Sequence, residues 1–330
     1  MNVTQTKTDE LNLKLTLEIA AEDYAAEYKK RFQDCKRKAD FKGFRKGMVP
    51  ASLIERVYGG QILAESVNET IYKGLTDYIT EQKLNVLGEP LSAEDQPEVE
   101  WKNGNDFTFL FDVALSPEVK FEVGKSDEVP HYTVGPVTKT DKAPMIENLK
   151  KFYEEKKEEK SEEDIDKEVT ERLKEEYRQE AEWRLTKDIR DYFVKKADLK
   201  LPEAFLKRWL LQANEGKVTA EEVEKEFPGF AEDYKWQMVR GYLMEKFDFK
   251  VEQKDITDAA ESYVRYQYAM YGLPEVPAEI LTDAVNNMLG DRKQVERLYE
   301  QVEDRKVIEK LKEEITVKAT KITTAKFREL

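Results

Sequence analysis

The sequence has almost none of the residue types from which most catalytic and metal sites are built. Cys35 is the only cysteine and His131 the only histidine among 330 residues. One cysteine excludes an internal disulfide and fits a reducing compartment such as the cytoplasm. A single histidine, placed among prolines, leaves no Cys-His or Ser-His-Asp set and excludes metal sites built from histidine and cysteine. We therefore expect no metal ion, and the sequence does not indicate an enzyme.

Long apolar runs and nucleotide-binding loops are also missing. No stretch of about 18 apolar residues is present, so we expect no membrane-spanning helix. Residues 1–10 lack the basic head and apolar core of a secretory signal. Neither GxxxxGK(S/T) nor GxGxxG occurs, so no nucleotide cofactor and no ATP are implied. We expect a cytoplasmic protein that works without a cofactor.

The charge of the chain is unevenly distributed. The whole sequence carries a formal net charge of −14, which disfavours general binding to nucleic acid. Residues 29–46 hold nine basic residues and only two acidic ones, Asp34 and Asp40. This segment carries +7, so the rest of the chain carries −21. One basic region on an acidic protein predicts a single local docking surface for an acidic partner, such as ribosomal RNA.

The first third of the chain predicts an α+β domain over residues 1–115. Residues 11–19 alternate apolar and polar side chains, which is typical of a strand with one buried face. Residues 22–38 change to helical spacing, and a longer helix is expected over 61–82. Residues 107–115 indicate a well-buried strand. Mixed strands and helices of this kind are typical of an α+β domain.

The remaining two thirds predict a linker and then a helical domain. Residues 116–140 contain three prolines between short β-like pieces, which predicts an extended linker. Residues 141–330 are expected to be all-α. Helix breaks are predicted at 201–202, 228–229, 272–274 and Pro277, and the strand-like residues 317–320 are expected to pack back or fray. Residues 147–182 indicate a solvated helix with many i,i+4 ion pairs.

A glycine-rich loop at 43–50 is the most specific feature of the sequence. Gly43 and Gly47 allow sharp turns and close approach to a partner. Phe44 stands at the tip, beside Arg45 and Lys46, where an aromatic side chain can insert into a partner while the cations meet carboxylate or phosphate. The alternative is that Phe44 folds back and closes its own helix pair.

This loop resembles the ribosome-docking signature of the trigger factor family. The signature is Gly43-Phe44-Arg45-Lys46-Gly47-x-x-Pro50, placed after a strand and a basic helix. Tyr58-Gly59 and the sequence 107–119 also resemble the family, over about residues 1–155 and more weakly to about 320. The resemblance implies docking on the large ribosomal subunit, at an exit-tunnel protein and nearby rRNA. The residues expected to bind the ribosome are Gly43, Phe44, Arg45, Lys46, Gly47 and Pro50, with Arg37, Lys38 and Lys42 nearby.

The sequence departs from the family in one respect. Trigger factors usually carry an FKBP-like prolyl isomerase domain between the linker and the helical domain. Here the charged residues 153–160 continue directly into Ser161-Glu162-Glu163-Asp164, with no β-patterned segment between them. We expect the domain to be absent near residues 160–161, whether by natural loss or by deletion, and isomerase activity to be absent with it.

The helical domain supplies candidate residues for binding unfolded nascent chains. The resemblance implies two helical arms that form a cradle, and a weak homodimer away from the ribosome. Methionine adapts to varied partners, and tyrosine combines apolar area with a polar tip, so such residues suit sequence-tolerant binding. The alternative for each residue is an ordinary place in the core. The candidates are Trp209, Phe230, Trp236, Met238, Tyr242, Tyr266, Met270 and Tyr271.

Three other functions remain open at this point. The first is a residual prolyl isomerase, which a proline-peptide turnover assay would detect. The second is a ribosome-associated RNA-binding or assembly factor without chaperone activity, which the basic segment 29–46 favours. The third is a secreted or periplasmic chaperone, which the missing signal disfavours. The sequence predicts, before these, an ATP-independent chaperone that shields nascent chains at the ribosomal exit tunnel.

Overall fold

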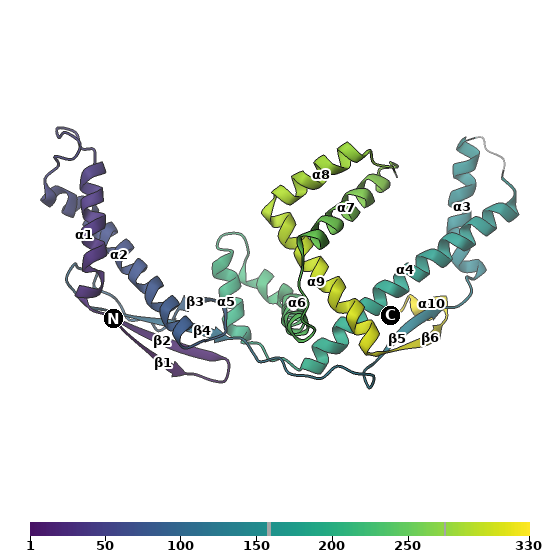
Figure 1. Cartoon of the computed structure of the whole chain (residues 1–330), viewed down its shortest axis with the longest axis horizontal. Coiled ribbons are helices and arrows are strands. Elements are labelled where there is room, and N and C mark those ends of the chain that lie inside the picture. The colour runs from purple at the N-terminus through teal and green to yellow at the C-terminus, as the bar shows by residue number, and fades with distance from the viewer. Residues whose placement is uncertain (157–159, 274) are drawn as a thin grey trace. The chain divides into compact units, whose positions relative to one another are not determined.

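Figure 1 shows the computed structural model, which describes residues 1–156, 160–273 and 275–330. The chain forms two compact units. Unit 1 contains Met1–Glu118 and Lys200–Ala231, and unit 2 contains Val119–Leu199 and Glu232–Leu330. The predicted boundaries near 115 and 140 stay a prediction. Residues 200–231 group with unit 1, although the sequence pattern assigned them to the helical domain.

Unit 1 contains a four-stranded antiparallel sheet in the order β1-β2-β4-β3. The strands are β1 (Asn2–Lys7), β2 (Asn12–Ile19), β3 (Val86–Ser92) and β4 (Phe107–Leu115). The two predicted strands are confirmed as β2 and β4. The alternate residues of β2 are buried on one face, where Leu15 lies opposite Phe111 and Leu17 opposite Phe109.

Two helices cover the buried face of this sheet. They are α1 (Ala21–Lys38) and α2 (Ala51–Glu81), which lie side by side in Figure 1. Tyr24 and Tyr28 of α1 and Leu63 and Val67 of α2 pack with the strands in one core. The predicted first helix is confirmed, whereas α2 begins ten residues earlier than the predicted start at 61. Ile54 and Ile62 are buried on either side of the Gly59–Gly60 pair, and this burial continues the helix through it.

A short helix from later in the sequence packs against the edge of this sheet. It is α5 (Glu203–Ala213), which contacts β3 and β4. The Arg208 guanidinium donates to Asp112 at 2.8 Å and to the Ser92 carbonyl at 3.0 Å. The Trp209 indole lies on Gly88, whose φ is +68° and which has no room for a larger residue. This packing explains why residues 200–231 belong to unit 1.

Unit 2 is mainly helical. It contains α3 (Lys139–Lys156), α4 (Glu162–Ala197), α7 (Gln253–Met270), α8 (Ala278–Gly290), α9 (Arg292–Glu314) and α10 (Thr324–Phe327). A parallel pair of strands, β5 (Glu128–Val134) and β6 (Thr316–Ile322), packs against α4. The expected strand-like segment 317–320 therefore packs back, as part of β6. No helix in the described parts of the chain is both long and apolar enough to cross a membrane.

Helix α4 organises unit 2 through a buried residue at every fourth position. A four-residue step turns the stripe by about 40° around the helix axis, so seven steps turn it by about 280°. The first half of the stripe packs with α3, and the second half packs with β5, α6 (Ala220–Lys246) and α9. The solvated helix predicted over 147–182 thus falls in two helices, α3 and α4, with residues 157–159 outside the described part of the chain. Its α4 part is buried along one spiralling line. Its residues are Ile165, Val169, Leu173, Tyr177, Ala181, Leu185, Ile189 and Phe193.

The predicted helix break at 228–229 is wrong. Pro228 lies inside α6 (Ala220–Lys246). A proline there removes one backbone hydrogen bond, at a cost of about 3 kcal/mol. Val223 and Phe227 are buried before the proline, and Val239 and Leu243 are buried after it. This burial offsets the lost hydrogen bond. The residues next to Pro228 do not show that it occurs, so the local sequence predicted a break.

The packing of α5 on β3 gives a first testable prediction. We expect Gly88→Ala to lower the free energy of unfolding of unit 1 by about 2 kcal/mol or more, because a Cβ there would lie 3.0 Å from the Trp209 indole nitrogen. Gly104→Ala is the matched control, since Gly104 also has a positive φ of +95° but faces open space. Gly104→Ala should lower the free energy of unfolding by only about 1 kcal/mol, the cost of placing alanine at a positive φ. Urea denaturation followed by circular dichroism measures both, and equal losses would contradict the packing.

Candidate functional site

The loop between α1 and α2 consists of two consecutive tight turns. The Phe44 amide donates to the Phe41 carbonyl at 3.0 Å, and the Met48 amide donates to the Arg45 carbonyl at 2.8 Å. Each bond joins residue i+3 to residue i, as in a β-turn. The predicted exposed loop is therefore an ordered pair of turns.

Each turn depends on a glycine at its third position. Gly43 has a φ of +95° and Gly47 a φ of +82°. A positive φ at this position is the requirement of a type II turn, and glycine meets it without strain. No atom lies within 4 Å of where either Cβ would be, so the glycines are needed for conformation and not for space.

Both ends of the loop are held by a small core at the tip of the helix pair. Ala39, Val49 and Ile54 are buried there together. The Phe41 ring turns back and meets the Tyr58 ring edge-on, with the ring centres 5.9 Å apart. Phe41, and not Phe44, therefore closes the helix pair. Closing the helix pair, the alternative role considered for Phe44, is the role of Phe41.

The tip of the loop presents apolar and cationic side chains together. Phe44 is 44% exposed and Met48 is 73% exposed. Arg45 and Lys46, between them, are exposed as well. The loop thus offers an aromatic ring and a thioether chain beside two cations, on a backbone that both turns hold in place.

The cations of the loop are available to a partner. Among the residues that the structure describes, Lys38, Lys42, Arg45 and Lys46 form no ion pair. Arg37 pairs with Asp34, and this guanidinium holds the pKa of the Asp34 carboxyl below its usual range. Burial raises the pKa of the nearby Cys35 thiol. Arg37, predicted to help bind the ribosome, is therefore already engaged, whereas the cations nearer the tip are not.

The candidate client-binding residues divide into two groups. Tyr266, Met270 and Tyr271 are 64%, 71% and 86% exposed at the C-terminal end of α7. The opposite face of α7 packs with α8 and α9 through Ile256 and Val264. The first group therefore forms a cluster of large apolar side chains open to solvent.

The other five candidates are packed within their own units. Trp236 is only 2% exposed, in the core of unit 2, and its indole donates to Asp304 at 2.8 Å. Met238 and Tyr242 are half-buried against the same core. Trp209 lies on Gly88, and Phe230 is half-buried in unit 1. We therefore leave Trp236 out of the candidate client-binding surface, and a client-binding role for the half-buried Trp209, Phe230, Met238 and Tyr242 stays a prediction.

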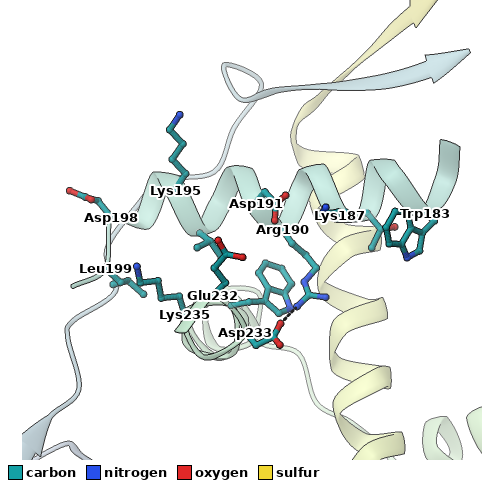
Figure 2. Close-up of a pocket in the computed structure, with 13 residues that line it drawn as sticks. Trp183, Lys187, Arg190, Asp191, Lys195, Asp198, Leu199, Glu232, Asp233 and Lys235 are labelled. Carbon is teal, nitrogen blue, oxygen red and sulfur yellow. Dashed lines mark hydrogen bonds and ion pairs between the residues drawn. The ribbon is translucent and has the colours of Figure 1, made fainter. Parts of the chain in front are cut away.

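A hollow between α4 and α6 contains an exposed tryptophan that the sequence analysis missed. Figure 2 shows Trp183 at one end of this hollow, which has a volume of about 520 Å³. Arg190 lies over the Trp236 ring at 5.3 Å and pairs with Asp233 at 3.3 Å. Trp183 is exposed because it falls between the buried positions 181 and 185 of the α4 stripe. That spacing is the signal that could have identified it.

Metal chemistry is not indicated. Within residues 1–156, 160–273 and 275–330, no group of three or more histidine, cysteine, aspartate or glutamate side chains is placed to hold a metal ion.

The anchoring of the loop gives a second testable prediction. We expect Val49→Ala to lower the free energy of unfolding of unit 1 by about 2 kcal/mol, because Val49 is 1% exposed and its loss leaves a cavity. Phe44→Ala should change it by less than about 0.5 kcal/mol, because the ring is already exposed. Urea denaturation of both variants tests this, and a larger loss for Phe44→Ala would contradict the exposed position of its ring.

Comparisons with known proteins agree with one another. A family model described as "Bacterial trigger factor protein (TF)" matches residues 1–149, and one described as "Probable trigger factor, C-terminal domain" matches residues 181–330. The chain also resembles a solved structure of the trigger factor chaperone, described for promiscuous substrate recognition in folding and assembly. That match has a TM-score of 0.52 at 13% identity and covers 94% of this chain and 99% of the other, which shows the fold.

Curated relatives named trigger factor match a shorter part of the chain. The protein from Geobacter sp. strain M21 is 33% identical over 120 residues, covering 36% of this chain and 27% of the relative. The protein from Haemophilus ducreyi is 30% identical over 151 residues, covering 46% and 34%. The matched part thus spans about a third or less of each relative's length. With both family models matching one after the other along the sequence, the chain belongs to the trigger factor family.

Proposed function

We propose that this protein is an ATP-independent chaperone that docks at the ribosomal polypeptide exit tunnel and shields nascent chains. The observation that carries the proposal is the tip of the α1–α2 loop. Phe44 is exposed there beside Arg45 and Lys46, two cations without an ion-pair partner among the described residues. The proposed partner is the large ribosomal subunit, through an exit-tunnel protein and nearby rRNA.

The loop has the physical properties of a docking element. An aromatic side chain that fills a partner's pocket often supplies a large share of the binding free energy. Arg45 can form a bidentate contact with a carboxylate, and Lys46 can act as a point charge toward carboxylate or phosphate. The two turns fix the loop before binding, so little conformational entropy is lost on docking.

The proposed client-binding surface is the exposed cluster Tyr266, Met270 and Tyr271 on α7. These side chains offer apolar area without a fixed pattern of hydrogen bonds, which suits clients of varied sequence. Docking keeps this surface near the emerging chain, so weak contacts suffice because the local concentration is high. A client leaves when its own folding buries the same apolar residues, and no ATP is needed.

We also propose that the protein has no prolyl isomerase activity. Helix α3 ends at Lys156 and α4 begins at Glu162, so only residues 157–161 separate them. A β-rich isomerase domain does not fit in this connection. The single cysteine supports a place in the reducing cytoplasm. The proposed docking would hold part of the protein on the ribosome there. The weak homodimer implied by the family stays a prediction.

Ribosome binding is the first test of the proposal. We expect the wild type to sediment with bacterial 70S ribosomes and Phe44→Ala/Arg45→Ala/Lys46→Ala to remain in the supernatant. Loss of one aromatic anchor costs about 2 kcal/mol, which is about thirtyfold in affinity. Loss of the two cations should weaken binding further and reduce its dependence on salt.

A matched control removes the same groups elsewhere in unit 1. Tyr72→Ala/Lys73→Ala/Lys7→Ala deletes one exposed aromatic ring and two cations, with the same change in net charge. Residue 72 lies about 30 Å along α2 from its start. This variant should sediment as the wild type does. Equal behaviour of all three proteins would refute docking through the loop.

Client binding is tested separately by the suppression of aggregation. We expect Tyr266→Ser/Met270→Ser/Tyr271→Ser to suppress the aggregation of a chemically unfolded client about tenfold less well, because each side chain loses about 0.5 kcal/mol or more of apolar burial. The control Tyr72→Ser/Phe152→Ser/Tyr299→Ser removes three other exposed rings and should act as the wild type. Ribosome sedimentation should be unchanged in both variants.

The same assay separates the proposal from its main alternative. The exposed cations Lys38, Lys42 and Lys46 also suit a ribosome-associated RNA-binding or assembly factor. Such a factor would bind ribosomes but would fail to suppress aggregation even as the wild type. That result would favour the alternative.

A further inference from the structure

The two turns of the α1–α2 loop repeat the same four-residue pattern. Phe41-Lys42-Gly43-Phe44 and Arg45-Lys46-Gly47-Met48 each have lysine at the second position and glycine at the third. Each closes with the same hydrogen bond from the fourth residue to the first, and each glycine has a positive φ. Met48 therefore occupies in the second turn the position that Phe44 occupies in the first.

We propose that Met48, four residues after Phe44, is a second apolar anchor of the docking loop and binds the same ribosomal protein surface as Phe44. This inference rests on the proposed function. The surface that fits has an apolar depression with carboxylates around it. Ribosomal RNA is then the secondary contact, made through the cations alone.

No contact among the residues that the structure describes accounts for the exposure of Met48. At 73% it is the more exposed of the two turn-ending residues, and it packs in none of the apolar clusters of unit 1. The next residue, Val49, is buried in the core at the helix tips. Burial of Val49 fixes the backbone directly after Met48, while the Met48 side chain stays exposed. The molecule thus keeps a large apolar side chain in water at a fixed place.

The charges around the two anchors indicate the chemistry of the partner. Lys42 precedes Phe44 by two residues, and Lys46 precedes Met48 by two, and both lysines are exposed. An apolar centre with a charged rim is the usual arrangement of a protein–protein interface. A methionine side chain has no donor or charge for phosphate, and its flexible thioether suits an irregular apolar surface. The pair therefore favours a protein surface over RNA.

The test uses the full chain and non-translating 70S ribosomes, with affinity measured by sedimentation over a range of protein concentrations. We expect Met48→Ala and Met48→Gln each to weaken binding by about tenfold, because each removes the apolar contact that Met48 would make. Met48→Leu should bind within about threefold of the wild type, because it keeps the apolar volume. Tyr72→Ala removes an exposed side chain of unit 1 outside the loop and should leave the affinity unchanged.

The outcomes separate this inference from the proposed function. Weaker binding by the alanine and glutamine variants, with leucine retained, supports Met48 as an anchor. Wild-type affinity in all Met48 variants, with loss only in Phe44→Ala/Arg45→Ala/Lys46→Ala, overturns the inference and leaves the proposed function intact. Absence of binding by the wild type overturns both.

Dependence on salt decides between protein and RNA as the main partner of the loop. If an anchor contacts protein, Met48→Ala lowers the affinity by the same factor at low and high salt. If the loop binds RNA phosphates, Lys42→Ala/Lys46→Ala weakens binding and makes the remaining affinity less dependent on salt, while Met48→Ala has no effect. The second result overturns the inference.

Discussion

The four-residue stripe of α4 is the constraint on which unit 2 depends. A helix with a stripe of period 3.6 buries one face, whereas a stripe of period 4 spirals around the axis. The eight buried residues from Ile165 to Phe193 therefore face successive neighbours along the helix. α3 covers the first half, and β5, α6 and α9 cover the second. Segments distant in the sequence are brought to one helix by this single pattern.

Burial likewise positions the α1–α2 loop of unit 1, which we propose docks on the ribosome. The two turns are short and exposed, so the buried residues on either side of the loop hold them in place. Ala39, Val49 and Ile54 form the small core at the helix tips, and the Phe41 ring closes it against Tyr58. Because these residues are buried, Phe44 and Met48 remain outside. An exposed aromatic residue is thus maintained by the burial of its neighbours.

The α1–α2 loop and the exposed cluster on α7 both hold apolar side chains in solvent. At the loop, apolar side chains stand beside cations that pair with no acid in the described parts of the chain, and on α7 they stand on the face opposite a packed core. In both places a rigid element holds apolar groups in water at a fixed position. Such groups bind a partner with little loss of conformational entropy.

Local patterns in the sequence were sufficient for several elements. The alternation in β2, the helical spacing of α1 and the apolar run of β4 each report burial against neighbours on one or two faces. The turns at Gly43 and Gly47 were also predicted from sequence, because a turn depends on the backbone of a few adjacent residues. The docking role of the loop stays a prediction. The predicted exposure of Phe44 agrees with the structure, although Phe41 took the packing role.

Other features required the tertiary structure. No local pattern distinguishes Trp236, buried in a core, from Tyr266, exposed on α7, since both lie in apolar helical runs. The continuation of α6 through Pro228 depends on burial along the whole helix. The pairing of β5 with β6 joins residues about 190 positions apart.

The sequence by itself determined strands β2 and β4, helix α1 and the position of the exposed loop after it, because those states depend on neighbours within a few residues. The tertiary structure alone decided which apolar side chains face solvent and that α5 packs on the sheet of unit 1. The physical reason is that burial depends on contacts between segments distant in sequence. Periodicity predicts which face of a helix or strand is buried, but it does not identify the segment that packs against that face.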